Sequence, residues 1–438
     1  MSLLWLYKNT MKLTGPLIRK TLLGRARLGK EDINRLTERQ GIASLPRTEG
    51  PLIWLHAASV GETQSLLKLI NLIASQMPDT KILVTSITVT ASDFLASRLP
   101  KQAFHQYLPV DHPAWVRRFV NYWRPDVVLW AESELWPNTL AALKKRHTPV
   151  ALLNARLSEK SFKRWSKIKN TAEAMLSSFA IIMCQTEKDK EYFSSLGGRS
   201  LVVTDNIKHS ADPLPCDTNN LARLQTAIAS RPLWLFASTH DGEEEIALRV
   251  HQNLLAKFPD LLTIIAPRHP SRRQEILEKI GNQGVQVTSR TAEHILPSPE
   301  TGIYLADTLG EMGLLLRVSP ITCMGRSLSR DGGGGHNPLE PALLGSAVLH
   351  GPYVQNLQDI YDTMTQSGAC QIVHNEDELA GTLGNLLTHP DQLIKLQKTG
   401  YNFAQSKSEI LDHILEELEP LFLSANLTPL HRLPHENS

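Results

Sequence analysis

The sequence predicts two doubly wound α/β domains that face each other across a cleft. Its length of 438 residues exceeds what one hydrophobic core comfortably holds. Short apolar runs alternate with longer stretches of helical periodicity, and this alternation indicates βαβ units. Runs such as residues 262–265 are apolar on both faces, as strands of a parallel sheet are. Together these observations favour two parallel sheets covered by helices.

The predicted strands fall into two groups of six, one before residue 205 and one after residue 232. The polar, proline-rich stretch 211–230 is the expected linker between a first domain over 41–210 and a second over 231–425, with a polar tail over 426–438. The predicted strands span residues 52–56, 82–86, 126–130, 150–154, 180–184, 201–204, 233–238, 262–266, 302–306, 321–324, 347–349 and 371–373.

The composition is that of a soluble globular protein, 42% hydrophobic and 21% charged. The net charge of +2 points to no particular partner, and no nucleic acid is expected. The four cysteines are far apart and lack metal-site spacing, so we expect buried thiols in a reducing compartment. They are Cys184, Cys216, Cys323 and Cys370.

The N-terminal segment 1–40 is basic and amphipathic. Its first thirty residues contain seven lysines and arginines and no acid, with leucines, Trp5 and Tyr7 between them. The charges interrupt any apolar run near the roughly 20 residues of a spanning helix or the core of a signal peptide. The segment is either a helix that lies on a membrane surface or a first helix that packs on the domain with solvated lysines.

Ligands of doubly wound sheets bind beyond the carboxyl ends of the strands, so residues that follow strands are the candidates for function. Ser59 and Glu62 follow the first predicted strand with the spacing of a capping box. Glu62 is also a candidate general base, and Gly61 between them would allow close approach of a ligand. We expect the helix end to lower the pKa of Glu62.

Two carboxylates, Glu132 and Glu134, follow the strand predicted over 126–130. They could bind a metal, although the pattern is a weak one, or they could precede an ordinary helix start at Pro137. A basic run from Arg156 to Lys169 follows the next strand. It is either a solvated helix face or a surface for an acidic lipid head group.

Three turns in the second half suit an anionic nucleotide. Arg268 and His269 lie between two prolines after the strand over 262–266, and Arg matches phosphate geometry. Thr308 and Glu311 form a second capping-box pattern, and four glycines over 332–335 follow the strand at 321–324. The glycine loop matches neither a Walker A pattern nor a Rossmann fingerprint, so neither an NTPase nor a dehydrogenase is predicted.

The glycine loop leads directly into a helix start. Asn337 is a suitable N-cap, Pro338 takes the first helical position, and Glu340 lies three residues after the cap. Glycines leave the backbone free to take φ > 0 and to approach a ligand. The stretch is either a phosphate cradle at a helix N-terminus or a flexible surface loop before an ordinary capped helix.

Together these motifs resemble the 3-deoxy-D-manno-octulosonic acid (Kdo) transferases of the GT-B glycosyltransferase superfamily, which have two Rossmann-like domains. The glycine run is longer than the two glycines of the family motif. The resemblance runs through Ser59–Glu62, Glu132–Asn138, Asn154–Leu157, Asp205–Lys208, Ser238–Glu243, Pro267–Pro270, Asp307–Glu311 and His336–Glu340.

The resemblance implies transfer of Kdo from CMP-Kdo to a lipid A precursor (lipid IVA) with inversion, in lipopolysaccharide core biosynthesis. It implies attachment to the cytoplasmic face of the cell inner membrane, no essential metal and no cofactor. It makes Glu62 the base, and Glu132 and Lys208 transition-state stabilisers. It places CMP on Arg268, His269, Leu309, Gly310, Glu311, Asn337, Pro338, Leu339 and Glu340.

Two alternatives remain open at the level of sequence. One is another GT-B transferase that uses a UDP- or GDP-sugar. The other is a non-catalytic nucleotide- or lipid-binding protein of the same fold, for which a damaged base position would be expected, whereas Glu62 is present.

Overall fold

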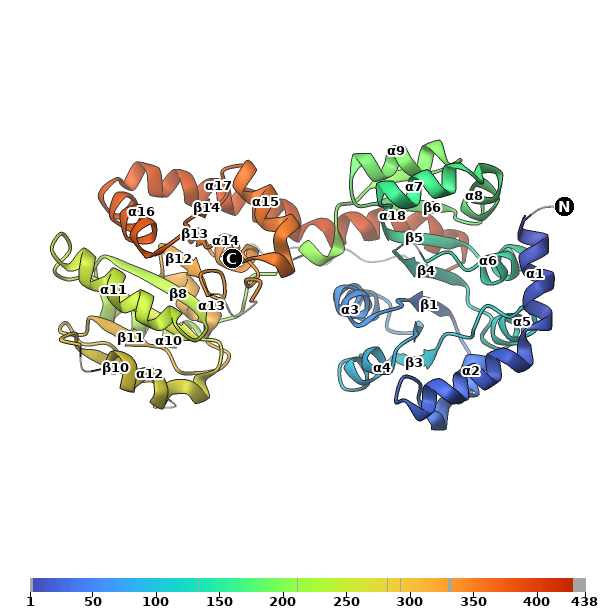
Figure 1. Cartoon of the computed structure of the whole chain (residues 1–438), viewed down its shortest axis with the longest axis horizontal. Helices are drawn as coiled ribbons and strands as arrows, with labels where there is room; N and C mark the ends of the chain where they lie inside the picture. Colours follow the sequence, from blue (N-terminus) through green and yellow to red (C-terminus); the bar gives the residue numbers. More distant parts are fainter. Residues whose placement is uncertain are drawn as a thin grey trace. The chain divides into compact units, whose positions relative to one another are not determined.

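The computed structural model describes residues 3–132, 134–210, 212–281, 283–291, 293–329 and 333–427. The chain divides into two compact units, and each is built on a parallel sheet of seven strands (Figure 1). Unit 1 comprises Met1–Lys208 and Ile410–Ser438, and unit 2 comprises His209–Glu409. The predicted class, two parallel α/β sheets, is confirmed.

The sheet of unit 1 has the strand order β3-β2-β1-β4-β5-β6-β7, and each neighbouring pair is parallel. The chain order reverses between β1 and β4, which makes the crevice beyond their carboxyl ends the expected ligand site. The strands are β1 (Leu52–His56), β2 (Lys81–Ser86), β3 (Ala103–Tyr107), β4 (Val127–Ala131), β5 (Val150–Ala155), β6 (Ile181–Cys184) and β7 (Leu201–Val203).

Helices cover both faces of this sheet because successive strand side chains point to opposite sides. Ile53 and Leu55 enter one core with α3 (Val60–Gln76) and α4 (Val89–Ala96). Leu52 and Trp54 enter the other core, whose helices are α5 (Pro113–Trp123), α6 (Pro137–Lys145), α7 (Glu159–Ser166), α8 (Lys169–Leu176) and α9 (Glu187–Ser195).

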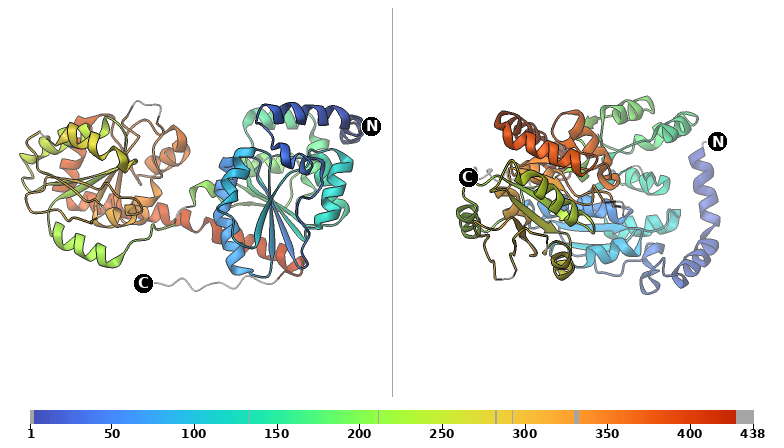
Figure 2. Two further views of the ribbon diagram at one scale, coloured as in Figure 1. Left: turned by 90° about the horizontal axis from the view of Figure 1, so that it is seen from below. Right: turned by 60° about the vertical axis from the view of Figure 1, so that its left-hand side comes forward.

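The C-terminal helix α18 (Ile410–Ser424) also belongs to unit 1. Its apolar side chains, including Ile414 and Leu418, join the core of α3 (Figure 2, red helix). The sequence-based division had counted residues 410–425 with the second half. Apolar periodicity identifies a helix, but it does not say which of two cores the helix enters.

The sheet of unit 2 has the order β10-β11-β9-β8-β12-β13-β14, again parallel, and reverses between β8 and β12. Its strands are β8 (Leu233–Thr239), β9 (Leu262–Pro267), β10 (Val287–Ser289), β11 (Ile303–Leu305), β12 (Ile321–Met324), β13 (Ala347–His350) and β14 (Gln371–Ile372).

The helices of unit 2 again form two layers. One layer contains α11 (Glu243–Leu255), α12 (Arg273–Ile280) and α16 (Glu376–Thr388). The other contains α10 (Thr218–Ile228), α13 (Met312–Val318), α14 (Leu339–Leu343), α15 (Gln358–Gln366) and α17 (Pro390–Ser408). Helix α10 lies inside the stretch 211–230 expected to be a linker, and Leu224 and Ile228 pack it into the core.

The twelve predicted strands all form, with small differences at their ends, and the prediction missed β3 and β10. Both are edge strands of their sheets. The cysteines are free thiols; Cys184, Cys323 and Cys370 are buried as expected, whereas Cys216 is only half-buried.

The N-terminal helices α1 (Leu3–Leu13) and α2 (Gly15–Arg27) lie on unit 1, where α1 contacts α5 and α6 (Figure 1). The Tyr7 hydroxyl donates to Asp111 at 3.1 Å. None of residues 3–13 is fully buried, and Leu6 and Leu13 are 55% and 84% exposed. No helix in the described part of the chain is long and apolar enough to cross a membrane.

Candidate functional site

Glu62 lies at the start of α3, directly beyond β1. The predicted capping box forms, because Ser59 Oγ accepts a long hydrogen bond from the Glu62 amide (3.4 Å) and donates to Glu62 Oε1 (2.8 Å). The Ala58 amide donates to Glu62 Oε2 at 2.8 Å. The carboxylate is therefore fixed by two donors, and the residue is only 8% exposed.

The pKa of Glu62 is raised rather than lowered, so the expected direction is wrong. Burial is the largest cause, and it outweighs the hydrogen bonds from Ala58 and Ser59, which act in the opposite direction. The negative charges of Glu132 and Glu134 raise the pKa further. A carboxylate with a raised pKa is a stronger base once it is ionised.

Lys208 and Glu132 form an ion pair in unit 1. The ammonium donates to Glu132 Oε1 at 2.8 Å, and the two side chains are 39% and 21% exposed. Glu132 follows β4 with φ = 54°, an uncommon value for this residue type. The structure thus brings together three residues from separate segments, Glu62, Glu132 and Lys208, near the β1/β4 reversal.

Two asparagines hold the segment that carries Lys208. Asn154, at the end of β5, accepts from the Ile207 amide at 3.1 Å through its side chain. Asn206 Oδ1 accepts from the Lys208 amide at 3.1 Å. Both asparagines are buried, so the backbone of Lys208 is anchored while its ammonium reaches outward to Glu132.

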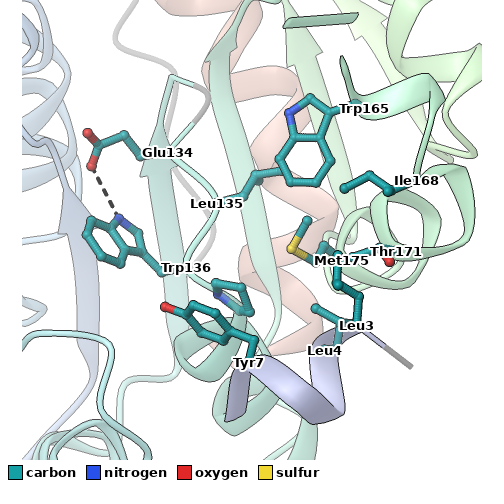
Figure 3. A pocket seen from close by; sticks show the side chains of 11 residues that line it. Leu3, Leu4, Tyr7, Glu134, Leu135, Trp136, Trp165, Ile168, Thr171 and Met175 are labelled. Carbon is teal, nitrogen blue, oxygen red and sulfur yellow. Dashed lines mark hydrogen bonds between the residues drawn. The ribbon is translucent and has the colours of Figure 1, made fainter. Parts of the chain in front are cut away.

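Glu134 completes the polar residues beyond β4. Its carboxylate accepts from Trp136 Nε1 at 3.2 Å (Figure 3) and lies 3.9 Å from Nε2 of His56, a fully buried ring. The imidazole lowers the pKa of Glu134, and burial lowers the pKa of His56. Glu134 is thus an ionised group beside a neutral histidine.

In unit 2 the equivalent strand reversal is organised by Glu243, a fully buried carboxylate at the start of α11. It accepts hydrogen bonds from five backbone amides. One is His240, at 2.9 Å, and the others follow β12: Arg326 (2.7 Å), Ser327 (3.1 Å), Leu328 (3.1 Å) and Ser329 (3.3 Å). The backbone amides that follow β12 therefore already donate hydrogen bonds to a side chain of the protein itself.

Three imidazoles gather at this end of the sheet. The rings of His240 and His336 stack with centroids 5.6 Å apart, and His269 meets His240 at 5.9 Å. Burial, together with the neighbouring His240 and Arg268, lowers the pKa of His336 to about 4. A neutral His336 therefore faces a cationic surface that includes Arg268, the exposed residue after β9.

Glu311 is tied to a buried arginine. Arg290, fully buried, donates to both carboxylate oxygens of Glu311 at 2.6 and 2.7 Å. Burial would raise the pKa of Glu311, but Arg290 and Thr308 together lower it. Leu309 beside it is 78% exposed, and Gly310 has φ = 82°.

The described part of the glycine loop is packed against the protein. Gly334 and Gly335 take φ values of 125° and 72°, as the sequence predicted. A Cβ on Gly334 would lie 2.5 Å from Asn356, so the close approach that this glycine permits is to a protein side chain. Ser133, Arg330, Asp331, Gly332 and residues beyond 427 lie outside the described residues.

The helix after the loop begins at Leu339 rather than Pro338. Asn337 Oδ1 accepts from the Leu339 amide at 3.1 Å, which is a cap-like bond, although Pro338 occupies the N-cap position itself. The Tyr361 hydroxyl donates to the His336 carbonyl at 2.6 Å. Glu340, in the first turn, is half-buried.

Sequence reasoning gave no individual role to Glu243, Arg290 or His240. Glu243 follows Gly242 at a helix start, which is an ordinary local pattern, and four of its five amide partners lie more than 80 residues away. Within the described residues no group of three or more His, Cys, Asp or Glu side chains could hold a metal ion.

Comparisons with known proteins point to one family. The family model of 3-deoxy-D-manno-octulosonic-acid transferase (kdotransferase) matches residues 34–211. A 3-deoxy-D-manno-octulosonic acid transferase of Rickettsia bellii is 35% identical over 397 residues, 90% of this chain and 94% of the relative. The enzyme of that name from Haemophilus influenzae is 33% identical over 400 residues, 90% and 92% of the two chains.

One solved structure is similar in fold across most of the chain. A UDP-GlcNAc 2-epimerase from Neisseria meningitidis aligns with 84% of this chain and 99% of its own at TM-score 0.51 and 15% identity, a likeness of fold. The C-terminal CMP-Kdo binding domain of WaaA from Acinetobacter baumannii is 28% identical, covers 44% of this chain and 96% of that domain, and has TM-score 0.40.

Two parallel seven-stranded α/β sheets with polar residues at the strand reversals place the protein in the GT-B fold class. The identity to relatives across nine-tenths of the chain makes the assignment more specific. The chain belongs to the 3-deoxy-D-manno-octulosonic acid transferase family and transfers Kdo from CMP-Kdo.

Proposed function

We propose that the protein transfers Kdo to a hydroxyl of a lipid A precursor with inversion, at the cytoplasmic face of the cell inner membrane, in lipopolysaccharide biosynthesis. The observation that carries the proposal is the grouping of Glu62 with the Lys208–Glu132 ion pair at the β1/β4 reversal of unit 1. One base and one cation in the same crevice are what an inverting displacement requires.

Glu62 takes the proton from the acceptor hydroxyl as that oxygen attacks the anomeric carbon. Ala58 and Ser59 hold the carboxylate in one orientation, so it does not have to reorganise during the reaction. A Cβ on the neighbouring Gly61 would meet no heavy atom of the described chain within 4 Å. This open space beside the base is where the acceptor sugar is expected to sit.

Lys208 and Glu132 stabilise the transition state. The ammonium of Lys208 favours negative charge on the departing phosphate, and Glu132 holds that ammonium in place. The leaving group is CMP, whose phosphate monoester is a stable anion. The reaction therefore needs no acid to protonate the leaving oxygen, and we propose that it needs no metal.

CMP binds unit 2 on the residues that follow three strands. Arg268 supplies a cation after β9, and the residues from Leu309 to Glu311 follow β11. Asn337, Pro338, Leu339 and Glu340 form the third group, around the start of α14. Because Arg290 already neutralises Glu311, this carboxylate can accept hydrogen bonds without repelling the nucleotide as a free charge would.

The test is Kdo transfer from CMP-Kdo to a tetra-acylated lipid A precursor, followed by mass spectrometry of the product. We expect wild-type protein to add Kdo with or without a chelator and Glu62→Gln to lose activity. Calorimetry with CMP and UDP tests the donor: binding of UDP but not CMP would indicate another GT-B transferase. CMP binding with no transfer by wild type would indicate a binding protein.

A further inference from the structure

An apolar cavity of about 440 Å³ lies in unit 1, and the reaction proposed above does not use it. Leu3, Leu4 and Tyr7 of α1 form one wall, and Thr171 and Met175 of α8 form the opposite wall (Figure 3). Leu135 and Trp136, which follow β4, also line the cavity. The volume is within the range of small-molecule sites, roughly 300–1,000 Å³.

The polar groups at the edge of this cavity already have partners inside the protein. The Tyr7 hydroxyl donates to Asp111, and the Glu134 carboxylate accepts from Trp136 Nε1. The remaining lining is mostly hydrocarbon and aromatic. Such walls offer burial without directional contacts, and this suits a flexible hydrocarbon better than a polar ligand.

Glu134 is common to the cavity and to the polar groups around Glu62. It lines the cavity, and the negative charge of its carboxylate contributes to the raised pKa of Glu62. A molecule in the cavity would therefore extend toward the carboxylates beyond β1 and β4. The occupant should be part of a molecule that also reaches the base.

The segments that line the cavity also carry basic and exposed apolar side chains. On α1, Lys8 and Lys12 accompany exposed leucines, and no acid occurs over residues 3–30. On the other side, α7 and the residues after it carry Lys160, Lys163, Arg164, Lys167 and Lys169, beside Ile168, which is 39% exposed. This combination complements an amphiphile with hydrocarbon chains and anionic head groups.

We propose that the cavity binds one acyl chain of the lipid acceptor, so that the sugar to be modified is presented to Glu62. This inference rests on the proposed function, since it names a binding subsite for that acceptor. The length of the acyl chain would then contribute to recognition through buried apolar surface, in addition to any contact with the head group. The acyl chain would leave the membrane surface and enter the cavity between α1 and α8.

The first test measures binding of a fluorescent fatty acid, 11-(dansylamino)undecanoic acid, to the full-length protein without substrates. Two variants fill the cavity from opposite walls, Leu4→Trp and Thr171→Trp, while Thr171→Ser is the matched control. We expect saturable binding by wild type and control, and a loss of about tenfold or more in affinity for both tryptophan variants. Equal binding by all four proteins would overturn the proposal.

The second test compares Kdo transfer to a tetra-acylated acceptor and to its O-deacylated form. We expect the tryptophan variants to raise KM about tenfold for the acylated acceptor, with kcat unchanged, and to leave the deacylated acceptor unaffected. Equal effects on both acceptors, or a parallel loss of binding to anionic vesicles, would argue against an acyl-chain subsite. If the wild-type protein modifies neither acceptor, the proposed function is wrong. Binding of the fluorescent fatty acid would still show whether the cavity holds a hydrocarbon chain.

Discussion

The ammonium of Lys208 donates to Glu132 Oε1 at 2.8 Å, although the two residues lie 76 positions apart in the chain. We expect Lys208→Met to lower kcat by ~100- to 1,000-fold, because a preorganised charge at the leaving phosphate is lost. Its free energy of unfolding should change by less than about 1 kcal/mol, since a partly exposed pair contributes little.

The control for this variant is Lys190→Met, which breaks an exposed pair with Glu187 at 3.7 Å in the same unit. Transfer assays and urea unfolding of the two variants separate the roles. A Lys208→Met protein with normal kcat would show that the Lys208–Glu132 ion pair has only a structural role.

Glu62 completes a helix cap and is the proposed base, and two substitutions separate these roles. Glu62→Gln keeps a side chain that can complete a capping box, so we expect a stability loss below about 1 kcal/mol and a loss of transfer of at least ~100-fold. Ser59→Ala removes the cap, which costs about 1 kcal/mol, yet leaves the carboxylate. If both variants lost activity in proportion to stability, Glu62 would have only the structural role.

The pH dependence of kcat/KM should show the raised pKa of Glu62. The base must be ionised, so we expect activity to rise with pH through a pKa above that of an ordinary glutamate. Glu132→Gln removes a negative charge that raises this pKa, and the acidic limb should move to lower pH. An acidic limb at the same pH in both proteins would assign it to another group.

The strands could be predicted because most lie inside parallel sheets and are continuous apolar runs. The two missed strands, β3 and β10, are at the sheet edges and are only partly buried. In β3 the polar residues His105 and Gln106 interrupt the apolar run. The other two edge strands, β7 and β14, were predicted, so edge position alone does not explain the misses; what β3 and β10 lack is the continuous buried apolar run of an inner parallel strand.

The site was predictable where its contacts are local. Ser59 and Glu62 are three residues apart, and this spacing alone predicts the capping box. Arg290 and Glu311 are 21 residues apart, and Glu243 reaches amides 83 to 86 residues later. Such pairs arise from the packing of loops beyond different strands, which no spacing rule encodes.

Glu243 should be the most sensitive position for the stability of unit 2. Glu243→Gln replaces one carboxylate oxygen by an NH₂ group, which would face backbone N–H donors. Some of the five backbone amides would therefore lose their hydrogen-bond acceptor. We expect a loss of about 2–4 kcal/mol in urea unfolding. Glu245→Gln is the matched control on the same helix, since Glu245 is 29% exposed and only 3.4 Å from Lys279.

The control should change stability by less than about 1 kcal/mol. We also expect weaker CMP binding by Glu243→Gln, because the same carboxylate joins the His240 turn to the segment after β12. If Glu243→Gln were as stable as Glu245→Gln, the buried carboxylate would not be what holds the two segments together.

Gly61 offers a test in which stability and function should change in opposite directions. Its φ is not positive, and a Cβ would enter open space within the described structure. Gly61→Ala should therefore stabilise the helix by up to about 1 kcal/mol. If that space receives the acceptor, the added methyl group should raise the acceptor KM several-fold. Gly381→Ala, also at a helical glycine with open space, should give a similar gain in stability with no change in KM, and an unchanged KM in Gly61→Ala would place the acceptor elsewhere.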